Sequence, residues 1–287
     1  MKKRGKMKMF VIIGVLLSVV GIALVFFNIP YSKTRTEFNH LTGSIIIETD
    51  KGTGIITEND IADLPTPVQN YFKFCGFIGI HKMAFMKVVY HDVDFLFGKD
   101  KPTMKIDYIQ YNFASVPMRI AYINSAIYGI TFEGLDAYVH GKGSMKGVIA
   151  KIHTLFNQTG DIMDKASLVT FLSECLLIPS VALQNYIIWE EIDDVNAKAT
   201  ISYYGETASG IFTFDEKNES VTFTTNDRVF TATDGTTDKV TWSTVSSDYQ
   251  EKDGIKTPTE FKAIWEYKDG DLVYFDGKGL ILYDTEE

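Results

Sequence analysis

Residues 9–27 form an apolar run of 19 residues without a single charge, and this run constrains the chain more than any other feature. About 20 apolar residues in a helix cross the hydrocarbon core of a bilayer. The run ends in Phe26-Phe27-Asn28, which offers no small-x-small cleavage site, and no cysteine follows that would carry a lipid. The sequence therefore predicts an uncleaved transmembrane helix over residues 9–27.

The charged residues are distributed unevenly around this run. Five basic residues and no acidic residue precede it, namely Lys2, Lys3, Arg4, Lys6 and Lys8. Because positive residues keep their side of an apolar helix in the cytoplasm, we expect residues 1–8 to be a basic cytoplasmic tail. The chain would then be a single-pass protein of the cell membrane, with its main domain outside the cytoplasm.

That domain is expected to be acidic. Without the five basic residues before the apolar run, 23 of the 28 basic residues remain against 37 acidic residues, a formal charge of −14. An acidic domain repels phosphate backbones, so nucleic acid is excluded as an expected partner. The membrane contact is instead expected to come from the N-terminal helix.

The rest of the chain divides into a polar juncture, residues 28–40, and a β-rich extracytoplasmic domain, residues 41–287. A domain of this length buries a substantial core without disulfides. Its two cysteines, Cys75 and Cys175, both lie among apolar residues. This placement favours two buried thiols, and a disulfide between them stays open as an alternative.

Segments that are typical of strands dominate the domain, because aromatic and β-branched residues recur between turn signals. Three Asp-Gly pairs, at 253–254, 269–270 and 276–277, are typical of tight turns between antiparallel strands. The pattern predicts an α+β fold that is mainly antiparallel β, with a large curved sheet or open half-barrel. The expected strand segments are residues 44–48, 83–97, 103–113, 118–123, 126–139 and most of 187–283.

Three further segments predict a few helices that form a lid over this sheet. The first begins with Thr66 as its cap and ends at Gly76, where a left-handed residue is expected. A weaker apolar pattern predicts a second helix over residues 148–156. The third covers residues 165–178, with Asp164 as its cap and an apolar face at helical spacing.

No motif predicts catalysis, a metal site or a cofactor. Residues 141–147 are rich in glycine but lack the order of a phosphate-binding loop, and they predict a flexible turn from strand to helix. The five histidines form no pair with the spacing of metal ligands, and His91 with Asp92 and Asp94 fits a solvated strand face. Cys175 falls on an apolar helix face, where a thiol stays protonated and inert.

Glu174 is the most informative charged residue, because it lies in the middle of the third predicted helix, which is otherwise apolar. One interpretation places it on a solvated stripe with Ser167 and Thr170. The other pairs it with an arginine, and only Arg119 and Arg228 follow the juncture. A partly buried pair needs both partners to offset the cost of desolvation. Such a pair would serve the structure or hold a polar headgroup.

Several short motifs occur in a fixed order along residues 60–283. They are Leu64-Pro65-x-Pro67-Val68-x-x-Tyr71, Leu172-x-Glu174-x-x-x-x-Pro179, Trp189, Ala197-x-Ala199, Asp227-Arg228, Trp242 and Tyr249-x-Glu251-x-x-Gly254-Ile255-x-x-Pro258. Taken together, they resemble a bacterial family of unknown function whose members join an N-terminal apolar segment to a β-rich domain. The last motif is also similar to a hairpin in lipoprotein carriers of the LolA/LolB type, which hold lipid chains in a curved sheet covered by helices.

The resemblance implies a binding protein without known catalytic residues, and many relatives have alanine at the position of Cys175. We therefore expect a non-enzymatic, membrane-anchored domain that binds a lipid, a lipidated protein or another apolar ligand. One alternative is a scaffold or interaction module of the cell envelope, and another is a hydrolase built on Glu174 and a nearby histidine. The sequence indicates no particular protein partner. The candidate ligand-binding residues are Arg119, Glu174, Arg228, Tyr71 and Trp189.

Overall fold

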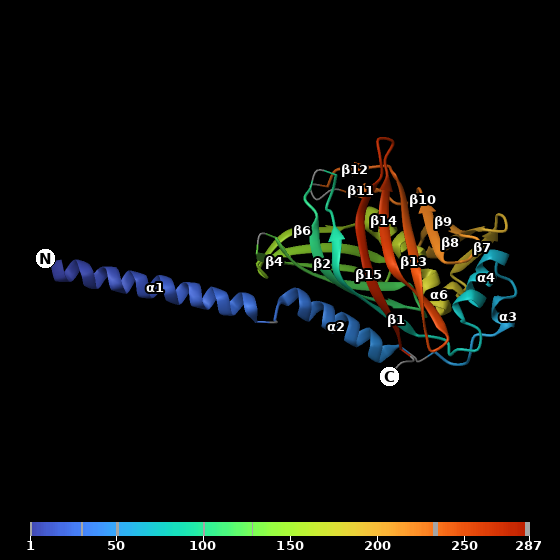
Figure 1. Cartoon of the computed structure of the whole chain (residues 1–287), viewed down its shortest axis with the longest axis horizontal. Coiled ribbons are helices and arrows are strands. Elements are labelled where there is room, and N and C mark those ends of the chain that lie inside the picture. Colours follow the sequence, from blue (N-terminus) through green and yellow to red (C-terminus); the bar gives the residue numbers. More distant parts are fainter. Residues whose placement is uncertain are drawn as a thin grey trace.

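A curved, 13-stranded antiparallel sheet forms most of the domain (Figure 1). The computed structural model describes residues 2–29, 31–49, 52–99, 101–127, 129–231 and 235–284. The strand order is β6-β5-β4-β3-β2-β1-β15-β14-β13-β10-β9-β8-β7, and a separate two-stranded sheet pairs β11 with β12. The first and last strands of the domain, β1 and β15, pair in the middle of the sheet, whereas β6 and β7 form its two edges. The expected open, mainly antiparallel fold is confirmed.

The elements follow one another along the chain with these bounds. The helices are α1 (Lys2–Asn28), α2 (Lys33–Glu48), α3 (Glu58–Ile61), α4 (Thr66–Cys75), α5 (Asp161–Ser173), the short 3-10 helix η1 (Cys175–Leu177) and α6 (Pro179–Ala182). The strands are β1 (Phe85–Phe95), β2 (Met104–Phe113), β3 (Met118–Ile127), β4 (Ile130–Val139), β5 (Lys142–Ile149), β6 (His153–Thr159), β7 (Ile187–Glu191), β8 (Asn196–Tyr203), β9 (Glu206–Phe214), β10 (Ser220–Thr225), β11 (Phe230–Thr231), β12 (Thr237–Asp238), β13 (Thr241–Lys252), β14 (Ile255–Glu266) and β15 (Leu272–Tyr283).

Helix α5 crosses the concave side of the sheet and holds its two halves together. It packs against β5 on one half and against β9 and β8 on the other. Its buried apolar residues, Leu168, Val169, Phe171 and Leu172, belong to the main hydrophobic core. In β1, β8, β9 and β10, buried residues alternate with more exposed ones, as the period of two in a pleated strand requires. The core side chains therefore lie between α5 and the sheet.

Helix α2 packs on the opposite, convex side of the sheet, against β3 and β4. Its residues Thr34, Phe38 and Thr42 are buried at a spacing of four, which brings them onto one helix face. Phe38 packs with Tyr111 and Tyr122 in a second, smaller hydrophobic cluster. The strand expected over residues 44–48 is wrong, because these residues continue α2. Their β-branched side chains favour a strand locally, but packing on the convex face stabilises the helix.

A β-hairpin replaces the helix that was expected over residues 148–156, which was therefore a wrong prediction. Strands β5 and β6 pair here, and the turn between them places Ala150 and Lys151 in the left-handed region, with φ of 54° and 64°. Non-glycine residues occupy that region rarely, so the sequence carries no turn signal at these positions. The flexible loop expected over residues 141–147 is also wrong, because residues 142–147 form most of β5.

The other two helix predictions are correct in place and differ at their ends. Helix α4 begins at Thr66 itself, so that Pro65 takes the cap position without a side-chain bond. Gly76 ends the helix with a left-handed φ of 73°, as expected. Helix α5 begins earlier than predicted, with Gly160 rather than Asp164 at its cap, and ends at Ser173, with Glu174 as its C-cap before η1.

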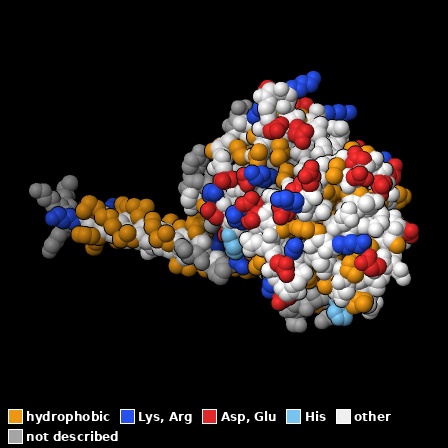
Figure 2. Space-filling model, turned by 45° about the vertical axis from the view of Figure 1, so that its right-hand side comes forward, with side chains coloured by type: hydrophobic (Ala, Val, Ile, Leu, Met, Phe, Trp, Pro, Cys, Tyr) orange, Lys and Arg blue, Asp and Glu red, His pale blue; other side chains and the backbone are white. Residues whose placement is uncertain are grey.

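Helix α1 extends away from the sheet and exposes its apolar side chains (Figure 1, Figure 2). Its segment Lys6–Phe27 is long and apolar enough to cross a membrane, and none of that segment is buried. Residues 2–8, expected as a separate tail, belong to this helix, although Met1 and the side chains of residues 2–5 lie outside the described part. On the visible face of the domain, acidic and basic side chains are interspersed (Figure 2). The topology across a membrane stays a prediction.

Both cysteines are free and buried. Burial raises the pKa of the Cys75 thiol to about 12, against the opposing effect of a hydrogen bond from Tyr71, and burial also raises the pKa of Cys175 above its ordinary value. Because the thiolate is the reactive species, we expect iodoacetamide at mildly alkaline pH to alkylate neither thiol in the folded protein and both in guanidinium chloride. Intact mass measures the number of adducts. Ser202→Cys, at an exposed position, is the positive control, and alkylation of the native folded chain would contradict the prediction.

Candidate functional site

A cavity of about 240 Å³ lies between the concave face of the sheet and α5. Its wall is mainly apolar and includes aromatic rings from several strands, among them Tyr90 from β1, Phe156 from β6, Trp242 from β13, Trp265 from β14 and Phe275 from β15. Strands from both halves of the sheet thus contribute to one cavity. The curvature of the sheet brings them together, and the aromatic rings keep most of the wall apolar.

Two segments with phenylalanine side chains border the cavity beside the sheet. Phe97, in the loop after β1, makes edge-to-face contacts with Phe132 and Phe156, at ring-centroid distances of 5.5 and 6.0 Å. Phe230, in β11, packs edge-to-face on Trp265 at 5.4 Å. Both Phe97 and Phe230 line the cavity. Aromatic contacts therefore help to hold both segments against the sheet, and Leu96 also donates its backbone N–H to Tyr274 of β15.

A polar network centred on Arg119 forms one part of the lining. From β3, its guanidinium donates from Nε to Glu174 Oε2 at 3.1 Å and from Nη1 to Asp136 Oδ2 at 2.6 Å. The Nη2 group donates to Gln110 Oε1 at 3.0 Å and to the hydroxyl of Tyr108. These partners come from β2, β4 and the end of α5. The network therefore ties three neighbouring strands to the helix that covers them.

Glu174 is the common acceptor of this network. Its Oε2 atom accepts from Gln110 Nε2 at 2.7 Å, from Asn112 Nδ2 at 2.8 Å and from Arg119 Nε. It reaches these donors because it stands at the C-terminal end of α5, where the helix leaves the sheet. The solvated stripe with Ser167 and Thr170, one of the two interpretations of the sequence, is therefore wrong for Glu174, and the pairing with an arginine is confirmed.

Burial and charge oppose each other at Arg119. Its side chain is 6% exposed, against 17% for Glu174 and 24% for Asp136. Burial by itself disfavours the charged guanidinium, but the carboxylates of Glu174 and Asp136 together with Tyr108 hold the pKa of Arg119 above its ordinary value. Burial also raises the pKa of the Tyr108 hydroxyl. Arg119 is thus a fixed cation and Tyr108 a neutral phenol at neutral pH.

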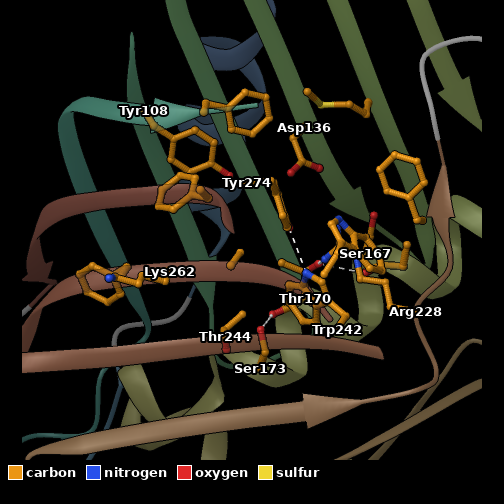
Figure 3. A pocket seen from close by; sticks show the side chains of 18 of the residues that line it. Tyr108, Asp136, Ser167, Thr170, Ser173, Arg228, Trp242, Thr244, Lys262 and Tyr274 are labelled. Carbon is orange, nitrogen blue, oxygen red and sulfur yellow. Dashed lines mark hydrogen bonds between the residues drawn. The ribbon is translucent and has the colours of Figure 1, made fainter. Parts of the chain in front are cut away.

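Arg228 occupies another part of the cavity wall, just before β11 (Figure 3). Its guanidinium lies over the ring of Trp242 at 4.3 Å and near that of Trp265 at 5.8 Å, within the range of cation–π attraction. Nη1 donates to the hydroxyl of Thr170 on α5. The neighbouring Asp227 pairs with Lys165 at 3.6 Å instead.

The structure brings some of the predicted ligand-binding residues together and separates others. Arg119, Glu174 and Arg228 all line the cavity. Tyr71 is buried in the core, where its hydroxyl contacts that of Tyr249 at 3.1 Å, and Trp189 packs on Phe212 and donates to a backbone carbonyl. Neither Tyr71 nor Trp189 is among the residues lining this cavity, so a binding role for them stays a prediction.

Sequence reasoning missed three partners of Arg119, namely Tyr108, Gln110 and Asp136, and it missed Asn112, which donates to Glu174. The three residues on β2 occur at a spacing of two, so they point to the same face of the strand. This polar alternation inside an otherwise aromatic strand was the available signal. No histidine lines the cavity in the part of the chain that the structure describes, so the hydrolase alternative lacks its second residue there.

The model of the family of unknown function DUF6544 matches residues 54–277. The chain belongs to the DUF6544 family. The match starts after α1 and α2 and covers nearly all of the curved sheet, so it includes every residue of the Arg119 network and Arg228. It confirms the resemblance to a family of unknown function, and it carries no activity to this member of DUF6544. A comparison with curated proteins gives no match.

Among solved structures, the chain has a structural neighbour in a LolA superfamily protein from Nitrosomonas europaea. The superposition covers 75% of this chain and 92% of that one, with 10% sequence identity and a TM-score of 0.31. A similarity at this level carries no statement about ligand or function. The functional argument for this DUF6544 protein therefore rests on its own cavity.

Proposed function

We propose that this protein is a membrane-anchored binding domain whose cavity holds the apolar part of a lipid or of a lipidated protein. The observation that carries the proposal is the cavity of about 240 Å³ with its mainly apolar wall. Binding pockets for small molecules are concave and mostly apolar, with a few polar groups that fix orientation. The Arg119 network and Arg228 are such groups.

The size of the cavity supports a small apolar group rather than a bulky lipid. It exceeds the roughly 150 Å³ of an engineered apolar cavity that binds benzene, and it lies just below the range of about 300–1,000 Å³ for drug-sized ligands. A single acyl chain or part of one fits this size better than several chains together. The scaffold alternative needs a filled interior, which this cavity does not provide.

The anchor supports a location at the outer face of the cell membrane. The apolar side chains of Lys6–Phe27 are exposed to solvent, and burying them in a bilayer removes them from water. A domain held this way would receive and release its ligand close to the lipid that surrounds its helix. The same location follows from the basic residues at the N-terminal end of α1.

Ala263→Phe tests the proposal by filling the cavity. Ala263 lies on β14, and its small side chain lines the cavity. We expect native mass spectrometry of gently extracted native protein to show one bound apolar molecule per chain. A phenyl group in place of the methyl group is expected to abolish that adduct.

The matched control is Ile264→Phe, at the next position of the same strand, which does not line the cavity. It adds the same ring and is expected to keep the adduct. Thermal unfolding of both variants shows whether the fold is intact. The proposal fails if the native protein carries no apolar adduct under these conditions, or if Ala263→Phe retains the adduct as well as Ile264→Phe does.

A further inference from the structure

Arg228 differs from the other basic residues that line the cavity. Arg119 pairs with Asp136 and Glu174, and Lys262 pairs with Asp276 at 3.5 Å. Within the described residues, Arg228 makes no ion pair with any carboxylate, although it belongs to the same cavity wall. A partly buried cation without a counter-charge is unfavourable unless something else supplies the charge. Among the described residues, Arg228 is thus the one cation of the cavity wall without a carboxylate partner.

The side chain of Arg228 is nevertheless held in place. It stacks on Trp242, lies near Trp265 and donates one hydrogen bond to Thr170 (Figure 3). A guanidinium has five N–H donors, and only this one has an acceptor in the described part of the chain. A planar guanidinium with free donors matches the two oxygens of a carboxylate or phosphate. The rings orient the guanidinium before any ligand arrives.

The surroundings of Arg228 also specify what must be attached to the anion. Phe230, Trp242 and Trp265 line the cavity beside Arg228. A ligand whose oxyanion binds Arg228 would therefore place the rest of its molecule in apolar surroundings. The carboxylates of Glu174 and Asp136 already accept from Arg119 and disfavour a second anion at their end of the cavity. The ligand is therefore oriented, with its anion at Arg228 and its chain along the aromatic wall.

From this geometry we propose that the ligand is a single-chain anionic amphiphile whose terminal carboxylate or phosphate binds Arg228. This inference rests on the proposed function and adds the charge, the orientation and the number of chains. A guanidinium recognises a carboxylate and a phosphate by the same hydrogen bonds. Which of the two groups binds more tightly indicates which kind of lipid supplies the ligand. A carboxylate indicates a fatty acid, whereas a phosphate indicates a lysophospholipid-type headgroup.

Three probes with the same chain test the inference: dodecanoate, dodecyl phosphate and the neutral dodecanol. The full chain is placed in nanodiscs of a neutral phospholipid, with empty nanodiscs as the blank. Because Trp242 and Trp265 lie beside the site, the change in tryptophan fluorescence measures binding. We expect the native protein to bind at least one of the two anions more tightly than dodecanol. The tighter of the anions identifies the source.

Arg228→Gln is expected to weaken binding of that anion by about 10- to 100-fold, the usual size of a charge-assisted hydrogen bond. Binding of dodecanol should change less than about twofold, since the alcohol carries no charge to lose. Arg228→Lys keeps the charge without the planar fork and should fall between Arg228→Gln and the native protein. The matched control is Lys165→Gln, a nearby cation that already pairs with Asp227, and it should bind all three probes like the native protein.

The outcomes separate this inference from the proposed function. Tight binding of dodecanol that Ala263→Phe removes, with no preference for either anion, overturns the inference and leaves the proposed function standing. Equal weakening of all three probes by Arg228→Gln also overturns it, because the arginine would then act only on the shape of the cavity. Failure of every probe to bind the native protein overturns both.

Discussion

Replacing Arg119 by methionine is expected to lower the free energy of unfolding by about 3–5 kcal/mol. Methionine keeps much of the length of the side chain but leaves Glu174 and Asp136 without their shared cation. It also removes the N–H groups from which the Gln110 side-chain oxygen and the Tyr108 hydroxyl accept hydrogen bonds, and both of these residues are buried. Chemical denaturation of the full chain in mild detergent, followed by tryptophan fluorescence, measures the loss.

Two further variants show whether the loss comes from the network. Arg35→Met makes the same substitution at an exposed position of α2 and should change the stability by less than about 0.5 kcal/mol. Glu174→Gln combined with Arg119→Met should cost less than the two single variants added together, because each one breaks the same contacts. Additive costs, or an Arg119→Met variant as stable as Arg35→Met, would show that the network does not stabilise the fold.

Gly143→Ala is expected to destabilise the protein by about 1–3 kcal/mol, the usual cost of overpacking. A Cβ atom at Gly143 would lie 2.2 Å from the backbone carbonyl oxygen of Met163 and 2.5 Å from Ser167 Oγ, so α5 would have to move off β5. Gly143 also donates its backbone N–H to Asp164 at 2.7 Å, a bond that depends on the same close approach. The melting temperature of the full chain measures the effect.

Gly43→Ala makes the same substitution where nothing lies within 4 Å of the added atom. Gly43 is in the middle of α2, where alanine is favoured over glycine by roughly 0.5–1 kcal/mol. The two variants are therefore expected to shift the melting temperature in opposite directions. A Gly143→Ala protein that melts at or above the native temperature would refute the close packing of α5 on β5.

The sequence predicted the antiparallel sheet correctly, but it failed for residues 44–48 and for residues 148–156. Particular residues show the physical reasons. Asp253-Gly254 and Asp269-Gly270 lie between strands, as their local turn signals predict, and the long strands carry a period of two. The turn predicted at Asp276-Gly277 is wrong, because both residues lie inside β15, where Gly277 leaves room for Val93 of β1. The residues of the β5–β6 turn carry no such signal, and residues 44–48 are helical because of contacts with strands far along the chain. Local patterns predict elements whose causes are local.

The same limit applies to the candidate site. The pairing of Glu174 with an arginine could be predicted, because the domain has so few arginines and a carboxylate in an apolar helix needs a partner. The identity of the other partners could not, since Asp136 and Gln110 approach Arg119 only after three strands have paired in the correct register. Arg228 was a candidate because few arginines follow the juncture. Its position on the rings of Trp242 and Trp265 could be found only from the three-dimensional structure.

The packing of α2 on the convex face limits the reach of the domain. Because α2 is fixed along the sheet, only the four residues between Asn28 and Lys33 separate the end of α1 from the body of the protein. Fully extended, they span at most about 14 Å. In the proposed anchored state, the domain cannot lift away from the bilayer or swing toward a distant surface. It can exchange ligand with the lipid beneath it or with proteins that come to it.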